Sequence, residues 1–143
     1  WRERLDHLEA LRELQDVTGG FMCFIPLPYQ PGNNPLGGMG PDGLDYLRTM
    51  AVSRLFLDNI PHLKAYWVFA GIKPAQVALW AGADDFDGTI VEERIGHAAG
   101  ATSPKGLTVQ ELRRSIEAAG FFPVERNALF ASVGSHHHGT GSD

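Results

Sequence analysis

The sequence predicts an α/β protein in which parallel strands alternate with helices, followed by a C-terminal helix–strand extension. Apolar segments of strand length alternate with amphipathic stretches of helical spacing along most of the chain. One such segment, Phe21–Tyr29, is apolar without alternation, which is typical of a strand buried on both faces. Strands joined by crossover helices run parallel, so the pattern fits a partial TIM-type (β/α) barrel or a small doubly wound sheet.

Composition limits the classes to which the chain can belong. The 143 residues are 43% hydrophobic and carry a net charge of -5, as in an ordinary water-soluble domain. No Lys/Arg run points to nucleic acid, and no apolar stretch is long enough to cross a membrane. The single cysteine, Cys23, fits a reducing, cytoplasmic compartment and excludes an intrachain disulfide. We expect one domain over residues 1–130 and a disordered tail over 131–143, without a metal site.

The first half of the chain is expected to form a helix, a strand and a second helix. Leucines recur at helical spacing from Leu5 to Leu14, and Thr18-Gly19-Gly20 ends this helix. The chain starts inside that amphipathic pattern, which suggests a fragment of a longer protein. The strand Phe21–Tyr29 runs into a loop of Pro, Gly and Asn, after which Asp42 caps the next helix.

The second half continues the alternation of strands and helices. Each expected element is bounded by a local signal such as a proline, a capping pair or a glycine. In chain order these are a strand Leu63–Gly71, a helix opened by Pro74, a strand Ala83–Glu93, a helix with a capping box at Thr108 and Glu111 that ends at Gly120, and an extended segment 121–130.

Polar side chains gather where two predicted strands end, and parallel strands bring ligands to that edge. Asn33 and Asn34 are suited to bind carboxylates or hydroxyls, although these residue types are also common in turns. If strand alternation holds, Asp85 and Asp87 share one face, where carboxylates are costly unless they bind something. They are candidates for holding ribose hydroxyls or for acid and base roles. The plainer alternative is that Asp84 is solvated and Asp85 caps a turn.

Three other side chains have mainly structural interpretations. Cys23 lies in mid-strand and is expected to be inert core. Arg54 is expected to form a salt bridge to Asp58 or to the acidic strand. His97 is the exception: it comes just after that strand, and among the histidines it is the one we most expect to have a functional role.

Several stretches, in order and at similar spacing, resemble one family. They are "ERLDHLEALRELQDVTGGF", "FIPLPYQPGNNPL", "RTMAVSRLFLDNI", "GADDFDGTIVEERIGHAAGATSPKGLTVQELRR" and "AAGFFPVER". Together they resemble the C-terminal half of aminofutalosine synthases, which are radical S-adenosyl-L-methionine (SAM) enzymes of the futalosine route to menaquinone. Dehypoxanthine futalosine cyclase and the deazaflavin (FO) synthases share the outline.

The resemblance implies a barrel, a cofactor pair and a reaction. Family members fold as a (β/α) barrel and use SAM with a [4Fe-4S] cluster held by a C-x3-C-x2-C motif, which is absent from this sequence. This chain would then be the second half of the barrel, inactive without a missing N-terminal half. The full-length parent would be a transferase that adds the 5′-deoxyadenosyl radical to a small-molecule substrate, an enolpyruvyl-ether benzoate. The alternatives are a non-catalytic α/β ligand-binding module, or a fragment of the related cyclase or FO synthase.

The resemblance also points to particular residues without assigning individual catalytic roles. It implies that SAM or substrate binding involves Asn33, Asn34, Asp85, Asp87, Thr89, Glu92 and Arg4. A half-barrel would expose unpaired strand edges and apolar surface, so we also expect the chain to self-associate.

Overall fold

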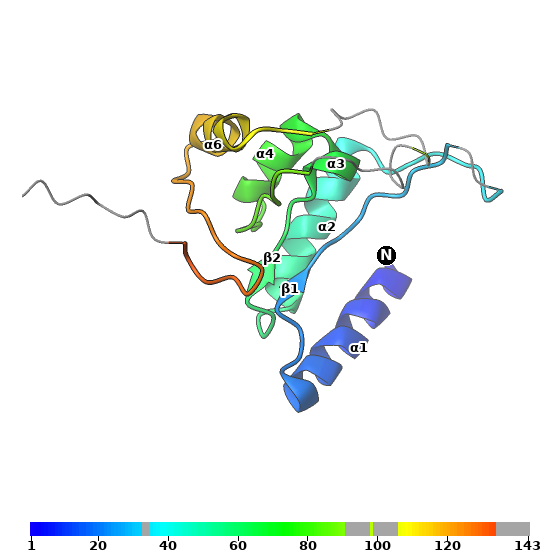
Figure 1. Ribbon diagram of the computed structural model, residues 1–143. Helices are drawn as coiled ribbons and strands as arrows, with labels where there is room; N and C mark the ends of the chain where they lie inside the picture. Colours follow the sequence, from blue (N-terminus) through cyan, green and yellow to red (C-terminus); the bar gives the residue numbers. More distant parts are fainter. Residues whose placement is uncertain (33–34, 91–97, 99–105, 134–143) are drawn as a thin grey trace, which may run out of the picture.

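The computed structural model describes residues 1–32, 35–90, 98 and 106–133 (Figure 1). This part of the chain forms five helices and a two-stranded parallel sheet, so the predicted α/β class and parallel pairing are confirmed. The elements are α1 (Arg2–Thr18), β1 (Cys23–Phe24), α2 (Gly43–Phe56), β2 (His62–Leu63), α3 (Trp67–Ala70), α4 (Ile72–Trp80) and α6 (Val109–Ala118).

Three segments of the chain lie side by side in parallel. In the sheet, Cys23 is opposite His62 and β1 is hydrogen-bonded to β2. A single parallel bridge between Lys64 and Asp85 adds the third segment, residues 83–90. Ala65 N–H donates to the Asp85 carbonyl at 2.8 Å. The third predicted strand is therefore reduced, within the described residues, to one bridge.

The first strand is shorter than predicted, because only Cys23–Phe24 of the apolar run pairs. Pro26 and Pro28 follow closely, and proline lacks the N–H group that a ladder position donates. Composition alone indicated an apolar segment but did not show where its pairing would end.

The second predicted strand, Leu63–Gly71, is wrong beyond its first residues. The chain turns into helix α3, whose Trp67 and Val68 are fully buried. An unbroken apolar run does not distinguish a strand from a buried helical turn, which explains the error. Helix α4 begins at Ile72, so Pro74 lies in its first turn, where its missing N–H is not needed.

The predicted helix ends are better supported. Asp42 accepts a hydrogen bond from Asp45 N–H at 2.7 Å at the start of α2. The capping box of Thr108 and Glu111 is present at the start of α6. Gly120, with φ 87°, follows the end of α6 in the left-handed conformation that a glycine accommodates there.

One face of the parallel segments packs against α2, α4 and α6 to form the main core. Leu63 of β2 and Phe86 of the third segment are buried there with Met50, Leu79 and Leu112 from the three helices. Burying a side chain of this size stabilises the fold by about 1.5–3 kcal/mol. These helices thus cover one face of the segments and do not cover the opposite face.

Helix α1 lies at one end of the molecule and α6 at the other (Figure 1). Gly19, with φ 59°, ends α1 as predicted. The buried Gln15 side chain accepts from Phe21 N–H at 2.8 Å and donates to the Phe21 and Asn59 carbonyls at 2.9 and 3.2 Å. These bonds fix the start of β1 against α1.

The C-terminal segment, Phe121–Val133, returns from α6 to the parallel segments (Figure 1). Phe130 stacks on His62 of β2, with ring centroids 4.1 Å apart. One antiparallel bridge, between Arg126 and Ser132, closes a turn within the segment. The predicted last extended segment therefore covers the sheet and does not extend the parallel ladder.

Candidate binding site on the face opposite the helices

Lys64 places a charge inside an otherwise apolar part of the sheet. Its neighbours Leu63 and Ala65 are buried with the helices, and successive residues of an extended chain point to opposite faces. Lys64 therefore lies on the face opposite the helices. Asp85 is opposite Lys64 in the ladder and precedes the buried Phe86, which places Asp85 on the same face.

Two cations and two carboxylates meet on this face. Lys64 Nζ lies 2.8 Å from Asp87 Oδ1 and 3.4 Å from Asp85 Oδ2. Arg126 donates to both oxygens of Asp85, at 3.1 and 2.7 Å. The side chains of Lys64, Asp85 and Asp87 are only 14%, 11% and 15% exposed, so their charges depend on one another. We call these four residues the ion-pair cluster.

The Lys64 ammonium is held in its charged form by its neighbours. Burial alone lowers the pKa of Lys64, because it disfavours the cation. The hydrogen bond to Asp87 and the charges of Asp87 and Asp85 act in the opposite direction and raise the pKa of Lys64 above its ordinary value. Lys64 is therefore a cation throughout the neutral pH range.

Cys23 lies near the cluster, and burial is the main cause that raises the pKa of its thiol to about 11. A thiol with this pKa is almost wholly protonated near neutral pH, as the predicted inert core role requires. We expect iodoacetamide to alkylate Cys23 about 100-fold more slowly in the folded chain than in urea at about pH 8. Mass spectrometry over time measures both rates, and equal rates would contradict the assignment.

A cavity of about 550 Å³ borders the cluster and also reaches the helix side of the third segment, because Leu79, Phe86 and Leu112 line it. Asp85, Asp87, Thr89 and Arg126 line it on the polar side. Its apolar lining comes from α4, the third segment, α6 and the C-terminal segment, namely Leu79, Phe86, Val109, Leu112, Ile116, Phe121 and Phe122. A cavity that combines an apolar wall with a few polar groups is the usual form of a small-molecule site.

The structure brings part of the sequence-predicted site together. Asp85 and Asp87 both contact Lys64 Nζ, so the prediction that they share a face agrees with the geometry, and Thr89 lines the same cavity. Asp85 pairs with Arg126, and no backbone N–H group of the described residues donates to its side chain as a turn cap would require. Asn33, Asn34, Glu92 and His97 lie outside the described residues.

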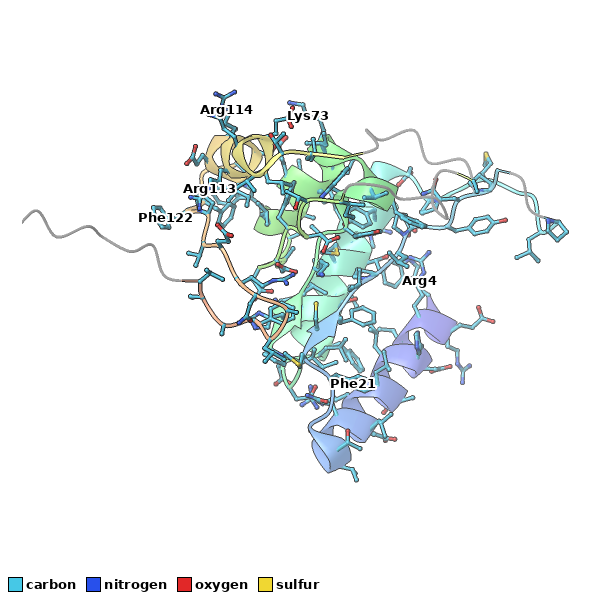
Figure 2. The ribbon with its side chains drawn as sticks, in the orientation of Figure 1. Arg4, Phe21, Lys73, Arg113, Arg114 and Phe122 are labelled. Atoms are coloured by element: carbon cyan, nitrogen blue, oxygen red, sulfur yellow. The ribbon has the colours of Figure 1, made fainter. Side chains whose placement is uncertain are left out.

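Arg4 is not part of this group. It projects from α1 toward α2, where it donates to both carboxylate oxygens of Asp45 at 3.0 and 2.9 Å and to Thr49 at 2.9 Å (Figure 2). The predicted contact between Arg4 and SAM stays a prediction, and the observed contacts join two helices.

Asp84 makes more polar contacts than predicted. Asp84 accepts from Leu63 N–H at 2.7 Å and from Arg54 at 2.6 Å, and it lies 2.7 Å from His62 Nδ1. Arg54 thus pairs with the acidic segment, one of the two partners expected for it, and Asp84 is not simply solvated.

Sequence reasoning missed Lys64 and Arg126. A lone lysine within the apolar run "LKAYWVFAG" was an available signal, because a buried lysine requires an anionic partner. Arg126 carried no such signal, since its partner Asp85 lies 41 residues earlier.

The residues present do not fit an iron–sulfur cluster. A [4Fe-4S] cluster is held by cysteine thiolates, whereas the chain has one cysteine, kept protonated by burial. No group of three metal-ligating side chains occurs among the residues that the structure describes. Any such cluster would have to be held outside this chain.

The fold and the site together define the class. Parallel segments with helices packed on one face and ion pairs on the other describe an α/β architecture. Residues 18–137 match the family described as the CofH/MqnC C-terminal region. The chain belongs to this family.

Curated relatives cover the same stretch at high identity. The chain is 54% identical over 136 residues to an aminodeoxyfutalosine synthase of Thermus thermophilus, covering 92% of the chain and 37% of that relative. It is 47% identical to an aminodeoxyfutalosine synthase of Streptomyces coelicolor, covering 90% of the chain and 36% of that protein. It is 38% identical to a 5-amino-6-(D-ribitylamino)uracil–L-tyrosine 4-hydroxyphenyl transferase of Methanococcoides burtonii, covering 93% of the chain and 40% of that protein.

The chain thus spans well under half the length of these relatives. The resemblance drawn from the sequence motifs is confirmed at the level of the family. Among the helices of the described residues, none combines the length and apolar character needed to cross a membrane.

Proposed function

We propose that residues 1–130 form the C-terminal part of the (β/α) barrel of a radical SAM transferase of the aminodeoxyfutalosine synthase type. The parallel order of three segments, with carboxylates on the face opposite the helices, supports this proposal. The 54% identity to the Thermus thermophilus enzyme supports the same type of reaction. The remaining strands, and the cysteines for a [4Fe-4S] cluster, would come from a region outside this chain.

The proposed reaction adds a 5′-deoxyadenosyl group to an enolpyruvyl-ether benzoate. SAM, when bound, supplies that adenosyl group. On this chain, Asp85, Asp87 and Thr89 bind polar groups of the reactants, and the apolar wall that includes Phe86 packs against an aromatic ring. Asn33, Asn34 and Glu92 are included in the proposed site through the family motifs that contain them.

A chimeric enzyme tests this function. We expect the Thermus thermophilus synthase to retain SAM-dependent synthase activity, within about tenfold of its parent, when its matching region is replaced by this chain. The isolated chain is expected to have none. Liquid chromatography with mass spectrometry detects the adenosylated product in both cases.

The control for the chimera is the matching region of the Methanococcoides burtonii transferase in the same host. It is expected to fold and to load the cluster, which iron content and brown colour report, but not to restore the synthase product. A cluster-loaded chimera carrying our chain that forms no product would overturn the proposal. Formation of a tyrosine-derived product would favour the related transferase activity.

A non-catalytic ligand-binding module is the second candidate. The cavity of about 550 Å³ favours it, because a space of this size with an apolar wall and a few polar groups is typical of a small-molecule site. Calorimetry with SAM, adenosine and aromatic acids separates the two candidates. Tight binding by the isolated chain would favour the module, whereas weak or absent binding fits a half-site.

A further inference from the structure

The two carboxylates of the ion-pair cluster use their oxygens differently. Both oxygens of Asp85 accept hydrogen bonds from Arg126, which ties this residue to the C-terminal segment. Asp87 accepts from Lys64 through Oδ1 alone. Within the part of the chain that the structure describes, Asp87 Oδ2 has no hydrogen-bond partner. Asp87 therefore keeps acceptor capacity that Asp85 has already used.

The backbone at Asp87 is also unusual. Its φ of 41° lies in the left-handed region, which non-glycine residues seldom adopt and which recurs at ligand sites. The next residue, Gly88, accepts a hydrogen bond from the buried Trp67 Nε1 at 3.4 Å. Asp87 is thus held at the cavity between an anchored glycine and the Lys64 ammonium.

The charges around the cavity indicate which hydrogen-bond donors a ligand would need to present to it. Each acid that lines the cavity among the described residues has a cationic partner within 3.5 Å, the pairs being Arg54–Asp84, Arg126–Asp85, Lys64–Asp87 and Arg113–Glu125. The acceptors therefore carry no unbalanced negative charge that would select a cation. Neutral donors such as hydroxyl groups are the matching ligand chemistry, and Thr89 lines the same cavity.

We propose that Lys64 is a positioning residue, which fixes Asp87 so that its remaining oxygen accepts hydrogen bonds from adjacent hydroxyls of a nucleoside ligand. Asp85 has a separate role, because it anchors the C-terminal segment through Arg126. This inference rests on the proposed function, in which SAM is the nucleoside, and it assigns different roles to two acids that the sequence pattern treats alike.

The first test is Asp87→Asn in the chimeric enzyme. Asparagine keeps the size of aspartate and tolerates the left-handed backbone, so the fold is preserved while the anionic acceptor is lost. We expect KM for SAM to rise about tenfold to a hundredfold, with kcat and KM for the aromatic substrate changed less than about threefold. A fall in kcat at constant KM for SAM would overturn the inference.

The second test separates positioning by Lys64 from a merely structural role. Lys64→Met is expected to raise KM for SAM in the same direction as Asp87→Asn, and Lys64→Arg is expected to restore most of the loss. The double variant Lys64→Met/Asp87→Asn is expected to be little worse than Asp87→Asn alone. Arg114→Met, at an exposed position of α6, is the control and leaves KM unchanged. Additive effects in the double variant would contradict the assignment.

Binding to the chimeric enzyme provides a readout that does not require catalysis. Adenosine is expected to bind at least about tenfold more tightly than 2′,3′-dideoxyadenosine, and Asp87→Asn is expected to abolish this difference. Equal binding of the two probes to the chimera with wild-type Asp87 would overturn the inference. An inactive, cluster-loaded chimera combined with preserved discrimination would overturn the proposed function and leave the inference standing.

Discussion

Replacing Gly82 with alanine is expected to lower the free energy of unfolding by about 3 kcal/mol. Gly82 has φ 104°, and an added Cβ would lie 2.7 and 2.8 Å from Cβ and Cγ of Arg54. Arg54 has little freedom to move away, because its Nε donates to the Gly82 carbonyl at 2.7 Å and its guanidinium pairs with Asp84 at 2.6 Å. Urea denaturation followed by circular dichroism measures the change.

Gly43→Ala is the matched control for this prediction. Gly43 is the first residue of α2, and an added Cβ there would meet nothing within 4 Å. Alanine in a helix is favoured over glycine, so this variant is expected to gain up to about 1 kcal/mol. A change in the free energy of unfolding of less than about 0.5 kcal/mol for Gly82→Ala would contradict the close approach of the Arg54 side chain to Gly82.

The parts of the fold that could be predicted from the sequence are those with local signals. Gly19 and the capping box at Thr108 specify a helix end and a helix start within a few residues, and both are present. Parallel pairing followed from the alternation of strand and helix, because a crossover helix leaves no other orientation. Each of these predictions depends on neighbouring residues and a general geometric constraint.

The parts that could not be predicted depend on contacts between distant segments. Trp67 and Val68 have strong strand propensity, yet they form a helical turn. In this conformation both side chains are buried in the main core. For the site, Asp85 and Asp87 both contact Lys64, as their predicted common face requires, although Asp87 has a φ of 41° and does not continue a strand. The pattern did not identify the cations that neutralise these acids. Arg126 reaches Asp85 across 41 residues, through a segment whose own pattern predicted only extended chain.

Arg126→Met is expected to lower the free energy of unfolding by about 2–3 kcal/mol. The substitution leaves Asp85, which is 11% exposed, without the two hydrogen bonds that Arg126 donates. It also removes the guanidinium that lies 4.3 Å from the ring centroid of Phe130, the residue that stacks on His62. We therefore expect the C-terminal segment to become more sensitive to limited proteolysis, in addition to the shift seen in urea denaturation.

Two further variants show whether the loss comes from a buried carboxylate that keeps only the more distant Lys64 as a cation. Arg113→Met breaks the Glu125 pair, whose side chains are 48% and 57% exposed and 3.5 Å apart, so it is expected to cost less than about 0.5 kcal/mol. Asp85→Asn added to Arg126→Met removes the buried charge and is expected to recover more than half of the loss. Failure of the double variant to recover stability would mean that Arg126 acts through packing on Phe130, and that Asp85 does not require its cation.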